Sequence, residues 1–402
     1  MIVLPIDFEE VLSTPPRTLR LHAAYRLERR ATGVHVQAFV TAASVAPFAA
    51  ETPAAFRAHA QRLGAALIDF DEAQCLDPVH VPKPWGREIW HTGIEARGVS
   101  RIVDADGACT PLPWVLAAAP RRLHAQSPIV LLKTLDPLPE PGLGDLYFEL
   151  HETKREVYVV THVDPRAWPD GVGAIRFGMN QALRRGYADD AAFRRAYLDA
   201  VRSYEAVRRR IDAHASPADL PADLVAAERR LREAMHRFTA LVPLSVGDVV
   251  RVPTWLPHSL QHGVRVIEFQ TPVYERRILS FGQKVLTQPH WDTDFAVQRM
   301  TLDTPLDAPF ELVEPAPGVV VEQIAAFEDF VVQRVRLAAG AQLPLAATRP
   351  YVLATGLIGE PAIGATPLPA ETACFVPGTA LHRGIRNDRD EAAVVLVAMP
   401  AA

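Results

Sequence analysis

Two short patterns of histidine and glutamate could supply ligands to a divalent metal ion. The first is Glu149-x-His151-x4-Glu156, and the second ends at His258, 102 residues after Glu156. Positions two apart in a strand point to the same face, so Glu149 and His151 can both face a barrel interior. Two imidazoles and one or two carboxylates suit a borderline divalent metal and leave a position for water or substrate. We therefore predict a catalytic metal site formed by Glu149, His151, Glu156 and His258, with Zn²⁺ or another divalent transition metal as cofactor.

Most of the chain that must position these residues reads as strands. Short β-rich runs separated by Pro and Gly extend from about residue 80 to 180, and strand patterns resume at Val249. Residues 181–240 instead predict helices, because apolar residues recur there at helical spacing. These residues are Phe193, Tyr197, Val201, Tyr204 and Val207, followed by Leu224, Leu231 and Phe238. The order predicts a mainly β fold with an α-helical insertion, not an alternating βαβ fold.

A weak internal repeat indicates a second copy of the same barrel. Residues 249–258 resemble residues 372–382, and in both segments a proline precedes a histidine by five positions. Two copies of one small β-barrel follow from this repeat. The second copy lacks the histidine and glutamate of the first, so His382 is expected to be structural.

Composition excludes several classes of function. The chain of 402 residues has 42 basic and 47 acidic residues, a net charge of −5, and 49% hydrophobic residues. This composition is typical of a globular protein and gives no electrostatic footprint for nucleic acid or anionic lipid. The N-terminus lacks a basic n-region, no apolar run approaches the roughly 18 residues of a membrane span, and three scattered cysteines favour a reducing compartment. We expect a cytoplasmic protein that binds neither nucleic acid nor membrane.

The metal-ligand patterns resemble the two motifs of the cupin superfamily, G-x5-H-x-H-x3–4-E-x6-G and G-x5-P-x-G-x2-H-x3-N. His151 and Glu156 match the first motif, and Gly247, Pro253 and His258 match the second. The chain departs from both motifs at several positions, two of which lie at the expected site. Those two residues are Glu149, at the first histidine position, and Trp255, in place of the glycine.

Longer segments resemble type I mannose-6-phosphate isomerases. Lys83-Pro-Trp-Gly-Arg-Glu-Ile-Trp90 is similar to their K-x-W-G-G-x-x-L segment, and Lys154-Arg-Glu-Val-Tyr-Val-Val to their K-T-E-x-W-Y-V strand. Residues 252–258, followed by 266–270 and Arg276-Arg277, are similar to their I-P-A-G-x-x-H-A, V-L-E-I-Q and T-Y-R segments. The resemblance spans roughly residues 80 to 402. It implies a double cupin, with helices inserted between the metal glutamate and the metal histidine and a second cupin without metal.

The resemblance also implies a division of the chain into four parts. An N-terminal strand and helix segment is expected to pack on the first, metal-binding cupin, which the helical insertion interrupts, and a degenerate second cupin follows. The boundaries are 1–75 for the N-terminal segment, 76–180 with 241–304 for the first cupin, 181–240 for the insertion and 305–402 for the second cupin.

Two family signatures are absent. The Q-x-H ligand pair is expected near residues 132–137, where Thr134 and Asp136 stand instead. Either Glu149 and His151 replace that pair, which we favour, or the metal binds in another way or not at all. His162 lies an even number of positions from Glu156, and His262 lies an even number from His258, so both are alternative candidates for a ligand. A surface position is the commoner role for such a histidine. The Y-x-D-x-N-H-K-P-E signature is also missing. Its absence argues against mannose 6-phosphate as the substrate more than it argues against sugar isomerisation as the reaction.

The resemblance implies an aldose–ketose isomerase for a sugar or sugar phosphate, working through an enediolate. The base is either Lys154, whose pKa a nearby divalent charge would lower, or Glu152. Arg277 is expected to hold phosphate or the enediolate oxygen. Lysine is rare, with four in the chain, which favours special roles for those in the motifs. The residues expected to contact substrate are Lys83, Trp85, Lys133 and Arg276.

Two other classes of function fit the same residues. The first is a metallo-cupin of another reaction class, such as a dioxygenase or an epimerase. The second is a non-catalytic carbohydrate-binding cupin, which the missing Q-x-H pair favours. The expected assembly is a monomer or a homodimer.

Overall fold

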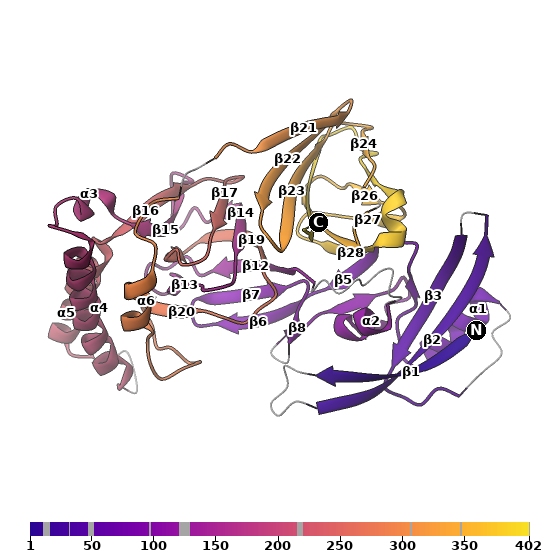
Figure 1. The fold of residues 1–402 in the computed structure, drawn as a ribbon, viewed down its shortest axis with the longest axis horizontal. Helices are drawn as coiled ribbons and strands as arrows, with labels where there is room; N and C mark the ends of the chain where they lie inside the picture. The colour runs from indigo at the N-terminus through magenta and orange to yellow at the C-terminus, as the bar shows by residue number, and fades with distance from the viewer. Residues whose placement is uncertain are drawn as a thin grey trace. The chain divides into compact units, whose positions relative to one another are not determined.

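A computed structural model describes the whole chain except residues 11–16, 32, 47–51, 96–97, 120–128, 215–219, 306–307, 346–347 and 402. The described chain is mainly β, as predicted, and its longest helices form one pair (Figure 1). Its strands form open sheets of nine, six, five, four, four and two strands. No closed barrel occurs among the described residues, so the double jelly roll is not confirmed. None of the described helices is both long and apolar enough to cross a membrane.

The chain divides into two compact units. The first contains Met1–Val81, Ile89–Lys133 and Pro309–Ala402, and the second contains Pro82–Glu88 and Thr134–Ala308. The grouping of the N-terminal residues with the C-terminal segment differs from the four parts expected from the sequence, and that division stays a prediction.

The first unit contains two four-stranded sheets, the nine-stranded sheet and a two-stranded hairpin. The N-terminal sheet has the order β1-β2-β3-β4, with β1 Ile2–Glu10, β2 Arg17–Arg30, β3 Gly33–Thr41 and β4 Ile68–Asp69. The nine-stranded sheet has the order β11-β10-β5-β28-β25-β30-β23-β22-β21. In that order, its strands are β11 Cys109–Pro111, β10 Arg101–Val103, β5 Gln74–Asp77, β28 Ala373–Pro377, β25 Tyr351–Ile358, β30 Ala393–Pro400, β23 Phe330–Leu337, β22 Val319–Ala326 and β21 Glu311–Ala316. The remaining strands are β24 Gln342–Leu343, β29 Ile385–Arg386, β26 Ala362–Ile363, β27 Thr366–Pro367, β8 Ile94–Glu95 and β9 Gly98–Val99, and the helices are α1 Pro53–Arg62, α2 Leu112–Ala118 and the 3₁₀ helix Gly378–Arg383.

The segment predicted to be the second copy lies in this unit. A continuous apolar cluster, which includes Val335, Val376 and Val395, packs between its strands. His382 is exposed on the 3₁₀ helix, and its Nδ1 lies 2.8 Å from the carbonyl oxygen of Thr379. This local contact agrees with the structural role expected for His382.

The second unit carries the predicted ligands on two sheets. The five-stranded sheet has the order β16-β15-β18-β13-β20, with β16 Thr239–Leu244, β15 Gly173–Met179, β18 His258–Leu260, β13 Phe148–Leu150 and β20 Arg277–Ser280. The six-stranded sheet has the order β17-β14-β19-β12-β7-β6, with β17 Val249–Val252, β14 Glu156–Val163, β19 Val264–Gln270, β12 Leu131–Pro137, β7 Gly86–Trp90 and β6 Val79–Lys83. The chain passes between the two units within β6, β7 and β12.

One apolar cluster joins the facing sides of these two sheets. Val160 and Val266 contribute from the six-stranded sheet, and Ile175, Leu260 and Ile278 contribute from the five-stranded sheet. Side chains alternate between the two faces of a strand. Residues an even number of positions from these apolar residues therefore point to the same inner face. That parity places Glu156 on β14 and His258 on β18 within the space between the sheets.

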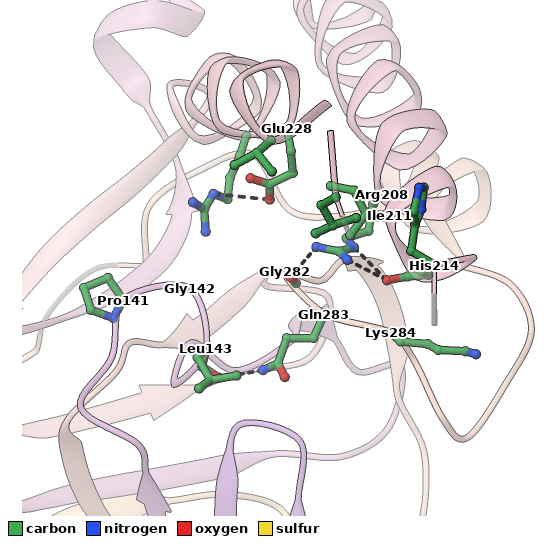
Figure 2. A pocket seen from close by; sticks show the side chains of 14 residues that line it. Pro141, Gly142, Leu143, Arg208, Ile211, His214, Glu228, Gly282, Gln283 and Lys284 are labelled. Atoms are coloured by element: carbon green, nitrogen blue, oxygen red, sulfur yellow. Dashed lines mark hydrogen bonds and ion pairs between the residues drawn. The ribbon is translucent and has the colours of Figure 1, made fainter. Parts of the chain in front are cut away.

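Helices cover the other, outer face of the five-stranded sheet. They are α3 Gln181–Arg184, α4 Asp190–Asp212, α5 Ala222–His236 and α6 Thr293–Arg299. The predicted stripe of α4 is buried, and it packs on Phe148 and Leu150 of β13 and on Met179 of β15. This confirms the stripe as core. A cavity of about 500 Å³ remains where α4 and α5 meet the loops at 141–143 and 282–284 (Figure 2).

Gly86, from the Trp-Gly pair singled out in the sequence, is fixed by close packing. Its φ is +147°, and a Cβ at this position would lie 2.3 Å from the carbonyl oxygen of Asp136. Trp85 beside it is buried in the apolar cluster between the sheets. The pair therefore has a structural role in closing the turn between β6 and β7 against β12.

We predict that Gly86→Ala destabilises the protein more than Gly247→Ala does. Gly247 has φ +93°, but a Cβ added there would meet no atom within 4 Å, so its substitution measures the cost of positive φ alone. Gly86→Ala adds a steric clash that should cost about 1–3 kcal/mol more. Denaturant unfolding of both variants checks this, and equal losses of stability would contradict it.

Candidate metal centre

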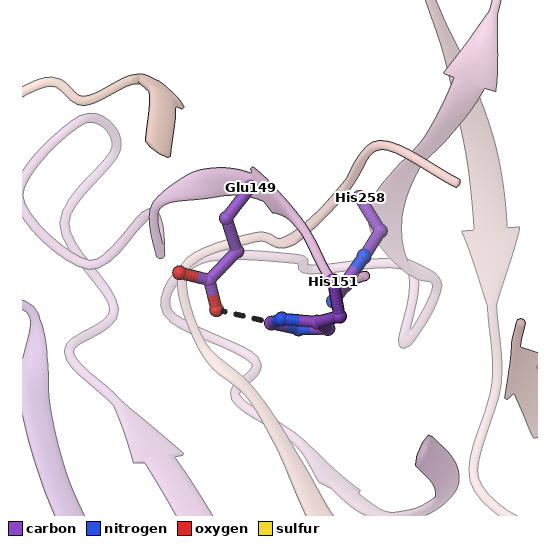
Figure 3. A group of neighbouring side chains, drawn as sticks. All are labelled: Glu149, His151 and His258. Atoms are coloured by element: carbon purple, nitrogen blue, oxygen red, sulfur yellow. Dashed lines mark ion pairs between the residues drawn. The ribbon is translucent and has the colours of Figure 1, made fainter. Parts of the chain in front are cut away.

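Glu149, His151 and His258 form a buried group whose ligand atoms lie within 4.8 Å of one another (Figure 3). Glu149 on β13 and His258 on β18 are direct partners in antiparallel register. His151 directly follows β13, at the same parity as Glu149, and its ring centroid lies 5.2 Å from that of His258. The strand alternation used in the sequence thus brings these three residues together.

Several polar atoms of this group are buried without a hydrogen-bond partner in the described chain. They are both ring nitrogens of His151 and Oε2 of Glu149. His151 is completely buried, and its Nε2 lies 3.9 Å from Glu149 Oε1. Buried polar groups are normally satisfied, so unpaired polar atoms at one point indicate a missing partner. Two imidazoles and a carboxylate are the donor types that Zn²⁺ and similar divalent metals bind, and the residues fit such an ion.

Glu156 approaches the same point from the opposite sheet. Its Oε1 lies 3.3 Å from His151 Nε2, and its Oε2 lies 3.1 Å from His258 Nε2. The Tyr158 hydroxyl donates to Oε2 at 2.5 Å, and the Lys154 ammonium lies 2.5 Å from Oε1. Glu156 therefore already has four polar neighbours, whereas Glu149 has an unsatisfied oxygen.

This cluster of charges shifts the pKa values of its members. Burial alone would raise the pKa of Glu156, but the adjacent Lys154 ammonium and His151 hold it well below its usual range. Burial alone would lower the pKa of Lys154, but Glu156, Glu149 and Glu268 outweigh it and raise that pKa. Burial, with a smaller effect of Lys154, lowers the pKa of His151. At neutral pH the chain's own groups thus favour an ammonium, a carboxylate and a neutral imidazole. From the sequence, a divalent metal is expected to lower the pKa of Lys154, whereas the protein's own carboxylates raise it.

Backbone contacts fix the ring orientation of His258 and the main-chain position of His151. The Nδ1 of His258 lies 3.0 Å from the carbonyl oxygen of Leu256, which directs Nε2 towards the cluster. The N–H of Trp255 donates to the carbonyl oxygen of His151 at 2.7 Å. Trp255 has φ +63°, a conformation that favours glycine, which is the residue that the cupin motif has at this position. The backbone therefore keeps the glycine-like turn although a tryptophan occupies it.

Glu275 holds the loop that links the two ligand-bearing strands. Its carboxylate accepts the backbone N–H of Glu152 at 2.8 Å and those of Thr153 and Lys154 at 3.0 and 3.3 Å. The Glu152 side chain instead pairs with Arg277, with Oε1 2.7 Å from Nε. The predicted base Glu152 and the predicted phosphate-binding Arg277 thus form one partly exposed ion pair, and Arg277 lies over the Phe295 ring of α6 on the helix-covered side of the sheet.

The other predicted substrate-binding residues have partners of their own. Arg276 lies over the Tyr147 ring at 4.4 Å, with its Nε 4.0 Å from Glu149 Oε2. Lys83 Nζ lies 3.2 Å from Glu88 Oε1, and in the first unit Lys133 lies 4.9 Å above the Trp90 ring. Arg276 is the member of this set with a direct contact to the candidate ligands. Substrate binding by Lys83, Trp85 and Lys133 stays a prediction.

The alternative ligands lie elsewhere. Thr134 is buried on β12, and Asp136 pairs with Arg87 at 2.6 Å and Arg265 at 3.1 Å. His162 is exposed, and His262 pairs with Asp145 and stacks on Trp168. None of them belongs to the group of candidate ligands found in the described chain.

Three residues of the cluster were missed in the sequence. Tyr158 lies two positions after Glu156 on the same strand face, so strand alternation could have identified it. Glu268 is buried on β19 as the direct partner of Tyr158. Glu275 lies beside Arg276 and Arg277, but nothing in its spacing indicates that it binds the backbone of a loop 121–123 residues earlier.

We predict that Lys154→Met strongly destabilises protein freed of metal by a chelator. Removing the ammonium leaves buried Glu156 without its counter-charge, which should cost about 3–5 kcal/mol. The double variant Lys154→Met/Glu156→Gln should recover part of this loss because both charges are removed. Denaturant unfolding measures each free energy.

A matched control is the exposed pair Arg229–Glu233, in which the two side chains are 77% and 67% exposed. Arg229→Met should cost less than about 1 kcal/mol. Independent, additive losses in Lys154→Met and Glu156→Gln would contradict the coupling between the two charges.

Comparison with known proteins supports the fold. No family model and no curated protein matches the chain. The mannose 6-phosphate isomerase from Bacillus subtilis is similar in structure, with a TM-score of 0.58 and 14% identity over 82% of this chain and 99% of its own. A mutant phosphomannose isomerase from Salmonella typhimurium (TM-score 0.56, 12% identity) and a zinc-bound mannose 6-phosphate isomerase (0.56, 11%) each cover 82% of this chain and 100% of their own. At these identities the similarity establishes that the chain shares their fold.

Proposed function

We propose that this protein is a metal-dependent aldose–ketose isomerase acting on a sugar or sugar phosphate. The observation that carries the proposal is the buried group Glu149, His151 and His258, with unsatisfied polar atoms. Support also comes from the fold, which is similar to that of isomerases of mannose 6-phosphate, one of them with zinc bound. Fold alone does not define an activity, so the proposal depends on the site.

In this proposal, Glu149, His151 and His258 hold Zn²⁺ or another divalent transition metal, and Glu156 is the fourth protein ligand. The bound ion would supply Lewis-acid polarisation of the carbonyl and hydroxyl oxygens of the sugar. The Leu256 carbonyl holds His258 with Nε2 facing the site, and the Trp255 N–H holds the backbone of His151. These contacts orient the His258 imidazole and hold the His151 backbone before any ligand arrives.

The chain's own charges assign the remaining roles. Isomerisation moves a proton between C1 and C2, which needs a group that can accept it. The pKa of Lys154 is raised by the surrounding carboxylates, so its ammonium suits donating a hydrogen bond to a developing oxyanion rather than accepting the proton. Glu152, which directly follows His151 and whose carboxylate pairs with Arg277, stays the candidate base.

The arginines at 276 and 277 are assigned to the substrate's anionic group. Arg276 is mostly buried beside Glu149, and Arg277 is 38% exposed at its side chain. Arg276 lies beside Glu149, whereas Arg277 pairs with Leu150 in register and packs on the Phe295 ring of α6, so Arg276 is the first of the two assigned to a phosphate. A phosphorylated sugar therefore fits better than a free sugar in this proposal.

Metal analysis of the purified protein, combined with a coupled aldose–ketose assay over hexose and pentose phosphates and free sugars, tests the proposal. We expect about one zinc or similar ion per chain, and activity that a chelator abolishes and added metal restores. His258→Ala and Glu156→Gln should each lower kcat/KM by on the order of 10²-fold or more. His262→Ala is the matched control, because His262 pairs with Asp145 away from the cluster.

Three outcomes would contradict the proposal. Full activity in chelator would exclude the metal. Bound iron with oxygen uptake would instead identify a dioxygenase. Sugar binding without turnover, unchanged in His258→Ala, would identify a non-catalytic carbohydrate-binding protein.

A further inference from the structure

A second polar cavity lies on the outer face of the five-stranded sheet, opposite the candidate metal centre. It has a volume of about 470 Å³, and its lining includes Arg176, Arg232 and His236. Arg176 on β15 is the direct register partner of Ser259 on β18, whereas the neighbouring Phe177 pairs with His258. Alternate residues of a strand face opposite sides of the sheet. One strand therefore contributes His258 to the inner site and Ser259 to a small neighbouring cavity that Arg176 and His236 also line.

Arg176 has no counter-ion. Its Nη1 donates to Thr239 Oγ1 at 2.9 Å, and its Nε is buried without a hydrogen-bond partner. No ion pair forms between Arg176 and any carboxylate in the part of the chain that the structure describes. Burial lowers the pKa of Arg176, which reflects the cost of holding this charge away from water. A buried guanidinium without an anion is unfavourable, and a bound anion would offset that cost.

Arg232 and His236, on successive turns of α5, add donors to the same cavity. Arg232 forms an ion pair with Glu228 within the helix, with Nε 3.6 Å from Oε1, and Glu228 also accepts the Tyr204 hydroxyl at 3.0 Å. The His236 ring makes no hydrogen bond with the described residues. Burial and the charges of Arg176 and Arg232 lower its pKa to about 3. His236 is therefore neutral at pH 7 and can donate one ring N–H.

Two carboxylates line this cavity, Asp145 and Glu233, and each has its own partners. Asp145 Oδ1 lies 2.7 Å from His262 Nδ1 and accepts the His262 backbone N–H at 3.1 Å, while Oδ2 accepts the Gly142 N–H at 3.2 Å. Gly142 also packs tightly, since a Cβ there would lie 2.3 Å from Arg232 Nη1. The Asp145 oxygens thus contact His262 and the loop, and the Asp145 charge also opposes the lowering of the pKa of Arg176 and His236 by burial.

The neighbouring cavity in Figure 2 provides a contrast. There Arg208 pairs with Asp212 at 2.8 Å and donates to the Gly282 carbonyl, and Gln283 donates to the Leu143 carbonyl. Both arginines that line it, Arg208 and Arg232, have a carboxylate partner within the described chain. Arg232 lines both cavities and pairs with Glu228, so the arginine without an ion-pair partner among the described residues is Arg176 of the second cavity.

We propose that Arg176, Arg232 and His236 form a binding site for a phosphate group, separate from the metal centre. Guanidinium groups match the oxygens of phosphate through paired N–H donors, and three donor side chains converge on this cavity. The volume lies within the range of small-ligand sites and accommodates a phosphomonoester as well as inorganic phosphate. The site is independent of the isomerase proposal, because its residues face the opposite side of the sheet.

Calorimetric titration with inorganic phosphate, at constant ionic strength set by NaCl, tests this site. We expect saturable binding to the chelator-treated wild type. The variants Arg176→Gln and Arg232→Gln should each weaken binding at least tenfold. Arg202→Gln, an exposed arginine of α4 that pairs with Asp294 and does not line the cavity, should change affinity less than twofold. A parallel titration with a hexose 6-phosphate distinguishes free phosphate from a phosphomonoester as the preferred ligand.

His258→Ala separates this site from the metal centre. Binding should persist in His258→Ala, whatever the result of the isomerase assay. Absence of saturable binding, or binding lost in His258→Ala and kept in Arg176→Gln, would overturn the proposal. Should Arg176→Gln fail to fold, the His236 ring signals of the wild type, followed by NMR, must shift on phosphate addition with the calorimetric affinity. Unchanged signals would also refute the site.

Discussion

The second unit depends on one buried carboxylate that bridges two sheets. Glu156 projects from the six-stranded sheet and contacts His151 and His258 of the five-stranded side, while Lys154 and Tyr158 satisfy its remaining oxygen positions. Burying a carboxylate is costly unless it is paired and hydrogen-bonded, and all four neighbours contribute to that compensation. Because Glu156 must meet all four polar partners, it limits the relative placement of the strands that carry them more than apolar packing would. A metal centre at this point therefore sits where the unit is already rigid.

Strand alternation is the reason that much of this site could be predicted from sequence. The period of two places Glu149 beside His151 and places Glu156 on an inner face, and the Gly-x5-Pro-x4-His spacing identifies His258. The helical stripe from Phe193 to Val207 was recognised by the same reasoning with a period of 3.6. Such local periodicities depend on backbone geometry alone. They remain valid even at the low identities that relate this chain to solved isomerases.

Long-range pairings could not be predicted in this way. Glu275 binds the backbone of residues 152–154, and Arg276 approaches Glu149, but neither contact has a signature in spacing. The rarity of lysine did point to Lys154, whose ammonium is buried in the cluster. It pointed equally to Lys83 and Lys133, which pair with Glu88 and Trp90. The rarity of lysine thus indicates which lysines have a special role, and the fold determines which residue each of them contacts.

Trp255 shows how a departure from a motif can be accommodated. The backbone keeps φ +63°, which costs a non-glycine residue about 1–2 kcal/mol, and its N–H still holds the carbonyl of His151. The indole lies 6.3 Å from the Phe295 ring, and the guanidinium of Arg277 lies 4.6 Å from the same ring. Contacts of this kind can offset the strain. Since Arg277 also pairs with Glu152, the tryptophan links the backbone that orients His151 to the ion pair at the edge of the site. A glycine there would relax the turn but lose this link, which gives a physical reason for the two departures, Glu149 and Trp255, to lie within one site.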